Sequence, residues 1–131
     1  MSFQIVNVLE RALDASALRQ KTISNNLANV ETPHYQSQRV VFEETLKEAM
    51  NPGTSFQGKR TDSRHFLIGS QSHLPVPYMI EEKTIQNNNE NGVDVDYEMT
   101  ALSKNSLWYN SLAQQINHEF NLLKTVIKGR G

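Results

Sequence analysis

Residues 94–129 read DVDYEMTALSKNSLWYNSLAQQINHEFNLLKTVIKG, the longest periodic segment of the chain. Its mainly apolar positions recur in alternating steps of three and four, which is the spacing of a coiled-coil seam. The seam positions are Val95, Met99, Leu102, Ser106, Tyr109, Ala113, Ile116, Phe120, Leu123 and Ile127. Acidic residues near its start and lysines near its end complement the helix dipole, and Gly129 supplies a stop. We therefore predict one long helix that packs against a partner.

A matching repeat lies near the start of the chain. Its positions are Val6, Leu9, Leu13, Ser16, Gln20, Ile23, Leu27 and Val30. This repeat predicts a helix from residue 2 to about residue 30, which Thr32-Pro33 ends because a residue before proline disfavours helical geometry. We expect a mainly α fold in which residues 1–30 and 93–131 pair as a coiled coil within one domain.

The middle of the chain is different in composition. Residues 39–50 predict a short third helix, although Val40-Val41-Phe42 could equally begin a strand. Residues 51–92 hold most of the prolines and glycines, and they predict an irregular or weakly β loop with short extended pieces at residues 65–68 and 78–85. The expected divisions are thus an N-terminal helical segment 1–50, a central loop 51–92 and a C-terminal helix 93–131.

The composition argues against several classes of function. Thirteen Lys+Arg against fourteen Asp+Glu give a net charge of −1, which favours neither nucleic acid nor anionic lipid as a partner. The chain has no cysteine, and its four histidines lack metal-binding spacing, so we expect no catalytic site, no metal and no cofactor. We also expect no membrane span and no cleaved signal peptide, since neither kind of apolar segment is present.

Residues 24–35 read SNNLANVETPHY. This stretch resembles the Asn-Asn-Leu/Ile-Ala-Asn-x-x-Thr-Pro-x-Tyr signature of the flagellar basal-body rod and hook protein family. The matching positions are Asn25, Asn26, Ala28, Asn29, Thr32, Pro33 and Tyr35. Two positions depart from the pattern: His34 stands where the family commonly has glycine, and Gln36 stands where it has a basic residue. If the turn needs a positive φ, His34 adopts it at a cost that glycine would not incur.

Three further stretches resemble one proximal rod protein of this family: RTDSRHF at 60–66, DVDYEM at 94–99 and LSKNSLWY at 102–109. The sibling proximal rod protein FlgC usually carries a Ser-Gly-Met-like element and an Ala-Ser-Arg-x-Tyr element, which are absent here. A protein of the FlgC type and a non-flagellar coiled-coil adaptor stay as alternatives. A peptidoglycan hydrolase is disfavoured because the chain has a poor core and no second domain.

The resemblance implies a structural subunit of the proximal rod, which crosses the periplasm or cell-wall space and transmits torque from the inner-membrane ring toward the hook. It implies export by the flagellar type III apparatus without a cleaved signal. The implied partners are copies of the chain, rod proteins of the FlgC, FlgF and FlgG type, the rod-to-ring adaptor FliE and the ring. The expected assembly seam consists of Leu9, Leu13, Ile23, Leu27, Val30, Met99, Leu102, Tyr109, Ile116, Phe120, Leu123 and Ile127.

Overall fold

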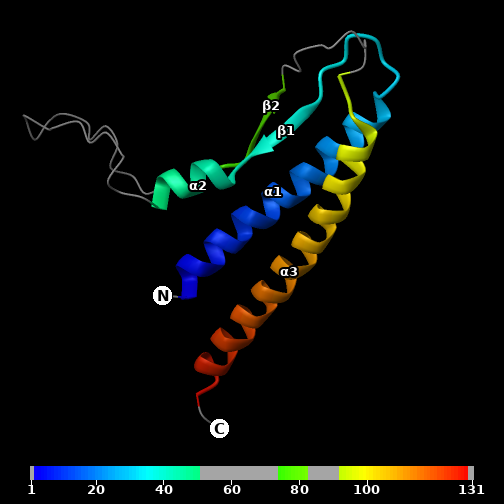
Figure 1. The fold of residues 1–131 in the computed structure, drawn as a ribbon. Coiled ribbons are helices and arrows are strands. Elements are labelled where there is room, and N and C mark those ends of the chain that lie inside the picture. The colour runs from blue at the N-terminus through cyan, green and yellow to red at the C-terminus, as the bar shows by residue number, and fades with distance from the viewer. Residues whose placement is uncertain (1, 51–73, 83–91, 130–131) are drawn as a thin grey trace, which may run out of the picture.

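The computed structural model describes residues 2–50, 74–82 and 92–129. The elements follow in the order α1 (Ser2–Ala28), β1 (Gln38–Val41), α2 (Glu43–Met50), β2 (Tyr78–Glu81) and α3 (Val95–Ile127). Figure 1 shows α1 and α3 side by side and antiparallel, with the two strands along the other flank of α1. The predicted mainly α fold with paired terminal helices, a short third helix and a weakly β middle is confirmed.

α1 ends at Ala28, slightly before the predicted end. The side chain of Asn29 donates a hydrogen bond of 2.8 Å to the carbonyl of Asn25, and the backbone N–H of Asn29 bonds the same carbonyl. The Asn29 side chain thus adds a second hydrogen bond to a carbonyl of the last helical turn, as short amide side chains do near helix ends. The chain then turns through residues 29–36 before β1 begins.

The segment predicted as a helix over residues 39–50 is half strand and half helix. Val40 and Val41 pair with Met79 and Tyr78 in an antiparallel two-stranded sheet, as suits β-branched residues. The carbonyl of Phe42 then accepts hydrogen bonds from Leu46 and from the Thr45 hydroxyl, so α2 begins at Glu43.

In the predicted central loop, β2 lies inside the extended piece expected at residues 78–85. The piece expected at residues 65–68 lies outside the described residues. The long C-terminal helix is α3. The carboxylate of Asp94 accepts from the backbone N–H groups of Asp96 and Tyr97, and Gly129 follows the helix with a φ of 61°. Both ends of α3 therefore match the signals in the sequence.

The core lies where Phe42 enters between α1 and α3. Phe42 is 2% exposed and packs with Ala12 and Ala15 of α1 and Leu112 of α3. Leu9, Leu13 and Leu46 surround this cluster. The two alanines matter because their small side chains leave room on α1 for the large ring.

The contact between α1 and α3 within one chain differs from the predicted seam. The buried positions of α3 are Glu98, Asn105, Leu112 and Glu119. Each comes one residue before a predicted position, so the predicted Met99 and Phe120 are about half exposed. On α1, the buried positions include Ala12, Ser16, Ile23 and Asn26. The spacing of apolar residues cannot predict this buried face, because small and hydrogen-bonded polar side chains form much of it.

Candidate functional site

The family signature folds into a junction centred on Asn26, which is 0% exposed. Its amide nitrogen donates to the carbonyl of Gln38 at 2.8 Å and to a carboxylate oxygen of Glu98 at 3.1 Å. Its amide oxygen accepts from the backbone N–H of Gln38 at 2.9 Å and from the Tyr35 hydroxyl at 3.0 Å. One side chain thus joins α1, the turn, β1 and α3, with its hydrogen-bonding capacity filled.

The other signature residues shape the turn. The Asn29 amide oxygen accepts from the Thr32 hydroxyl at 3.1 Å, and the Thr32 carbonyl accepts from the backbone of Tyr35. Pro33 is exposed, as are Asn25 and Ala28 of the signature.

His34 has a φ of 62°, so the turn does need a positive φ at this position. Among the described residues it is the one position other than glycine with a positive φ. Beyond the turn, Gln36 forms a parallel bridge with Gly92 just before α3. A Cβ atom at Gly92 would overlap the carbonyl oxygen of Tyr35, so the close approach of the two backbones requires glycine there.

The junction holds a buried acid. Burial raises the pKa of Glu98; the hydrogen bond from Asn26 lowers it in part, and the charges of Glu82 and Asp94 raise it further. Burial also raises the pKa of Tyr35, with added contributions from Glu98 and Glu81. The Tyr35 hydroxyl therefore stays protonated and keeps its role as a donor to Asn26.

A second polar contact joins the helices further along. The Ser16 hydroxyl donates to the amide oxygen of Asn105 at 3.1 Å, and the Asn105 amide donates back to the Ser16 carbonyl at 2.9 Å. Both side chains are buried. Ser16 is one of the predicted seam positions, whereas Glu98 and Asn105 lie outside the predicted seam. The available signal was the spacing of seven residues between Glu98, Asn105, Leu112 and Glu119.

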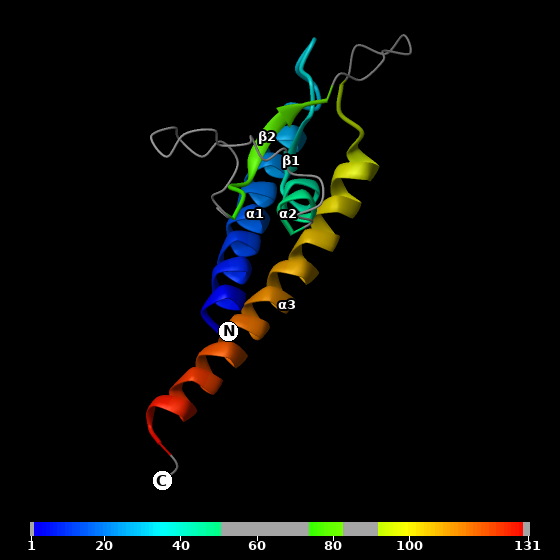
Figure 2. The ribbon, with the colours of Figure 1, turned by 90° about the vertical axis from the view of Figure 1, so that its left-hand side faces the viewer.

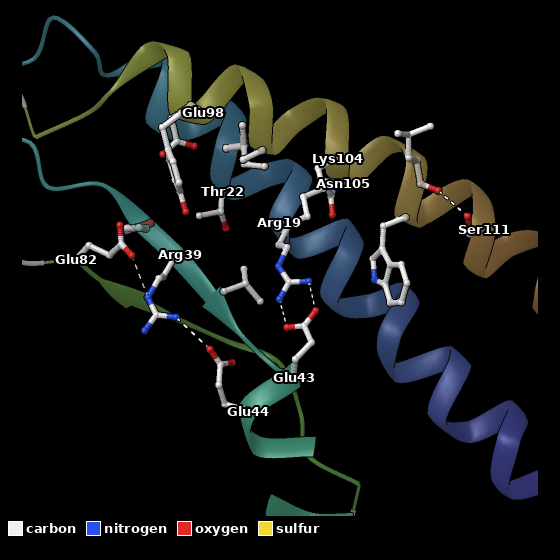
Figure 3. Close-up of a pocket in the computed structure, with 17 residues that line it drawn as sticks. Arg19, Thr22, Arg39, Glu43, Glu44, Glu82, Glu98, Lys104, Asn105 and Ser111 are labelled. Atoms are coloured by element: carbon white, nitrogen blue, oxygen red, sulfur yellow. Dashed lines mark hydrogen bonds and ion pairs between the residues drawn. The ribbon is translucent and has the colours of Figure 1, made fainter. Parts of the chain in front are cut away.

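An open groove of about 830 Å³ lies beside the junction, and Figure 3 shows the charged side chains along it. Residues of α1 form its floor; β1, α2 and Glu82, which follows β2, form one wall, and α3 from Tyr97 to Ser111 forms the other. Arg19 on the floor pairs with Glu43. Arg39 pairs with Glu82 at 3.0 Å and with Glu44 at 3.6 Å.

The ion pair between Arg19 and Glu43 ties the start of α2 to α1. Burial alone would raise the pKa of Glu43, but hydrogen bonds from Arg19 and from its own backbone, with the charge of Arg19, bring it below the usual value. Glu43 is therefore ionised at neutral pH, and the pair fixes the position of this wall of the groove.

The twelve predicted seam residues fall into three groups. Ile23 is buried, and Leu9, Leu13, Leu27, Val30, Leu102, Ile116 and Leu123 are partly buried. The other four lie exposed on α3: Met99, Tyr109, Phe120 and Ile127. More apolar side chains join them on this helix, including Leu107 at 71% and Val126 at 77% exposure. The structure thus leaves α3 with a large apolar surface.

The C-terminal part of α3 extends past the start of α1, as Figures 1 and 2 show. We call residues 120–128 the tail. It carries Phe120, Leu122, Val126 and Ile127 as exposed apolar side chains, together with Lys124 and Lys128. Because α1 does not reach this part of α3, these side chains have no covering helix within the described part of the chain.

Residues 2–50, 74–82 and 92–129 form neither a metal site nor a membrane span. No group of three or more His, Asp or Glu side chains in these ranges is arranged to hold a metal ion. None of the three helices is long and apolar enough to span a bilayer. What this part of the chain presents is a buried polar junction, a groove and an apolar helix surface.

Comparisons with known proteins agree with this arrangement. A family described as "Flagella basal body rod protein" matches residues 7–36, which contain most of α1 and the signature turn. The flagellar basal body rod protein FlgB of Bacillus subtilis is 36% identical over 121 residues, which cover 92% of this chain and 91% of that protein. FlgB of Escherichia coli is 30% identical over 88% of this chain and 90% of its own length. FlgB of Borreliella burgdorferi is 29% identical over 94% of this chain and 95% of its own length. From the signature turn and from relatives matched along nearly their whole length, the chain belongs to the FlgB family of structural flagellar basal body rod proteins.

Proposed function

We propose that this chain is a subunit of the proximal rod that acts through packing alone, without catalysis, and transmits torque from the inner-membrane ring toward the hook. The observation that carries the proposal is the exposed apolar surface of α3. A monomer that stayed single in water would be expected to expose smaller contiguous apolar patches. In an assembly, neighbouring helices would cover this surface.

In this proposal, the domain made of residues 1–30 and 93–131 is the part that assembles. The exposed seam residues Met99, Tyr109, Phe120 and Ile127 contact neighbouring subunits, whereas the buried polar contacts hold α1 against α3 within each subunit. This division is supported by burial, because the seam residues are exposed whereas the side chains of the polar contacts are buried. Helices that pack on both faces resist relative sliding, which is what a rotating shaft requires.

The finer details of the proposal rest on family membership. The neighbours would be copies of this chain, rod proteins of the FlgC, FlgF and FlgG type, and the adaptor FliE at the inner-membrane ring. The chain would leave the cytoplasm through the flagellar type III apparatus without a cleaved signal, and it would function where the rod crosses the periplasm.

The proposal is tested in a flagellated bacterium whose own FlgB gene is deleted. We expect the present chain to restore hook-bearing basal bodies and swimming, and we expect Met99→Asp and Tyr109→Asp to abolish both. These two side chains are about half exposed, so the aspartates should disturb contacts between subunits more than the fold. Asn117→Asp, at an exposed polar position of the same helix, is the matched control.

Circular dichroism of the purified variants separates loss of assembly from loss of folding. Restored swimming with both aspartate variants would show that this surface does not assemble. Failure of the unaltered chain to enter basal bodies would refute the proposed function.

A further inference from the structure

We propose that the tail of α3 from one copy of this chain docks in the groove of a second copy, so that copies join head to tail. The inference rests on the proposed rod function and adds to it the two surfaces that meet. It starts from the groove and the tail, neither of which is covered by another element within residues 2–50, 74–82 and 92–129.

The tail has the composition of a docking helix. Four large apolar side chains, Phe120, Leu122, Val126 and Ile127, are between 47% and 82% exposed. Residues 120–128 contain two lysines and no carboxylate. The tail is therefore apolar with a positive charge of two.

The groove offers the complementary chemistry. Its α3 wall carries the aromatic and apolar side chains of Tyr97, Leu107 and Trp108, all at least 46% exposed. The opposite wall carries three carboxylates, Glu43, Glu44 and Glu82, against the single arginine Arg39. Arg19 on the floor pairs with Glu43, and the α3 wall adds Lys104 and Glu98, so the whole lining holds four carboxylates against three cations. The apolar tail would lie on the aromatic side, with its lysines toward the acids.

Only another molecule can supply the tail. The groove is lined by α3 residues up to Ser111, and the tail continues along the same straight helix away from it. At 1.5 Å per residue, Val126 lies about 27 Å along the helix from Trp108. A continuous helix cannot fold back over that distance, so the tail of a chain never reaches its own groove.

The two surfaces differ from each other, so the contact is heterologous. After one such contact has formed, the pair of copies still has a free groove at one end and a free tail at the other. Contacts of this kind extend into an open assembly unless the rotation between copies closes a ring.

The natural absence of cysteine makes a direct test possible. Two tagged copies are expressed together in the deletion strain, one with Val126→Cys in the tail and the other with Leu107→Cys in the groove. Basal bodies are purified and treated with an oxidant and, separately, with a short bismaleimide that tolerates imperfect geometry. Ile127→Cys replaces Val126→Cys in a second series. Ser106→Cys, exposed on α3 outside the groove, replaces Leu107→Cys as the matched control.

We expect mixed-tag dimers from the tail and groove pairs at a yield about tenfold above the Ser106→Cys control, because docking holds the thiols at a high effective concentration. Lys124→Glu together with Lys128→Glu should lower the yield, and Glu44→Lys in the groove copy should restore it.

Basal bodies that contain both copies but give no more mixed dimer than the control would overturn the inference and leave rod membership standing. A tail cysteine that crosslinks only to another rod protein would likewise overturn the second copy as the occupant. Absence of unaltered tagged copies from basal bodies would refute the proposed function, and the inference with it.

Discussion

Replacing Asn26 with alanine should unfold the junction that joins four segments of the chain. The Asn26 amide pairs with both the N–H and the carbonyl of Gln38. These groups lie on the edge of β1 that faces away from β2, because alternate residues of an antiparallel strand point their polar groups to opposite sides. Without the amide, both backbone groups lose their partner in a site from which water is excluded.

The cost follows from the groups left behind. An unsatisfied buried donor or acceptor costs about 1–3 kcal/mol, so the two groups of Gln38 give about 2–6 kcal/mol. Water that enters the space of the missing amide would recover part of this, and we expect a loss of about 3 kcal/mol. Small domains are stable by about 5–15 kcal/mol, so such a loss removes a large share of the total.

The assay is urea unfolding followed by circular dichroism at 222 nm. With a denaturant slope of about 1.5 kcal/mol/M, the midpoint should fall by about 2 M. Asn25→Ala is the matched control, since it makes the same change in helix propensity at an exposed neighbouring position. Equal midpoints for Asn26→Ala and Asn25→Ala, within about 0.5 kcal/mol, would refute the reasoning.

A second substitution, Asn26→Asp, tests the same junction. It keeps the oxygen that accepts from Gln38 and Tyr35, but it places a carboxylate beside Glu98 in place of the donor. We expect it to be destabilising at neutral pH and less so in acid, where one of the two carboxyl groups holds a proton and can donate. A loss of stability that does not change with pH would argue against direct contact between the two acids.

Three other outcomes are expected. Burial raises the folded pKa of Glu98, so the stability that its protonated form contributes is present below the unfolded pKa of about 4.3 and is lost as pH rises through the folded pKa. Glu98→Gln should therefore have a higher melting temperature than the natural chain at pH 7–8 and the same melting temperature near pH 4, and identical melting curves at all pH values would contradict this. His34→Gly should keep or slightly raise the melting temperature, whereas His34→Val should lower the stability by about 1–2 kcal/mol, because the φ of 62° is costly for a β-branched residue. A glycine variant less stable than the valine variant would mean that the imidazole makes a contact that stabilises more than the backbone strain costs. Gly92→Ala should cost about 1–3 kcal/mol in urea unfolding, since its Cβ would meet the Tyr35 carbonyl, and an unchanged midpoint would mean that the backbones separate freely.

The long helices could be predicted because their signals are local. Asp94, the lysines of the last turn and Gly129 mark the ends of α3 whatever it packs against. The pairing of α1 with α3 was also predicted, from the matching repeats, whereas their antiparallel orientation was not. The strand at Val40 and Val41 stayed ambiguous, because its partner β2 lies almost forty residues further along the chain and pairing decides the outcome.

The interior of the helix pair could not be predicted in the same way. Hydrophobic periodicity assigns apolar residues to the inside, yet Asn26, Glu98 and Asn105 are buried while Phe120 is half exposed. A buried polar side chain is stable only where a specific partner meets it, and that partner depends on the three-dimensional arrangement. The signature indicated that Asn26 mattered, but its four contacts became apparent only in the folded chain.

The two buried polar contacts also determine how α1 and α3 align along their length. Ser16 meets Asn105 across 89 residues of sequence, and Asn26 meets Glu98 across 72. A register shift of one helix by seven residues would bring other residues with heptad spacing into contact. It would, however, place Leu112 or Glu98 beside Ser16 and leave amide and carboxylate groups buried without a hydrogen-bond partner. Such groups penalise a wrong alignment far more than apolar contacts do, as a single buried asparagine does in coiled coils. The polar interior thus discriminates against misaligned helix pairs during folding, which a seam made only of leucine and isoleucine would do poorly.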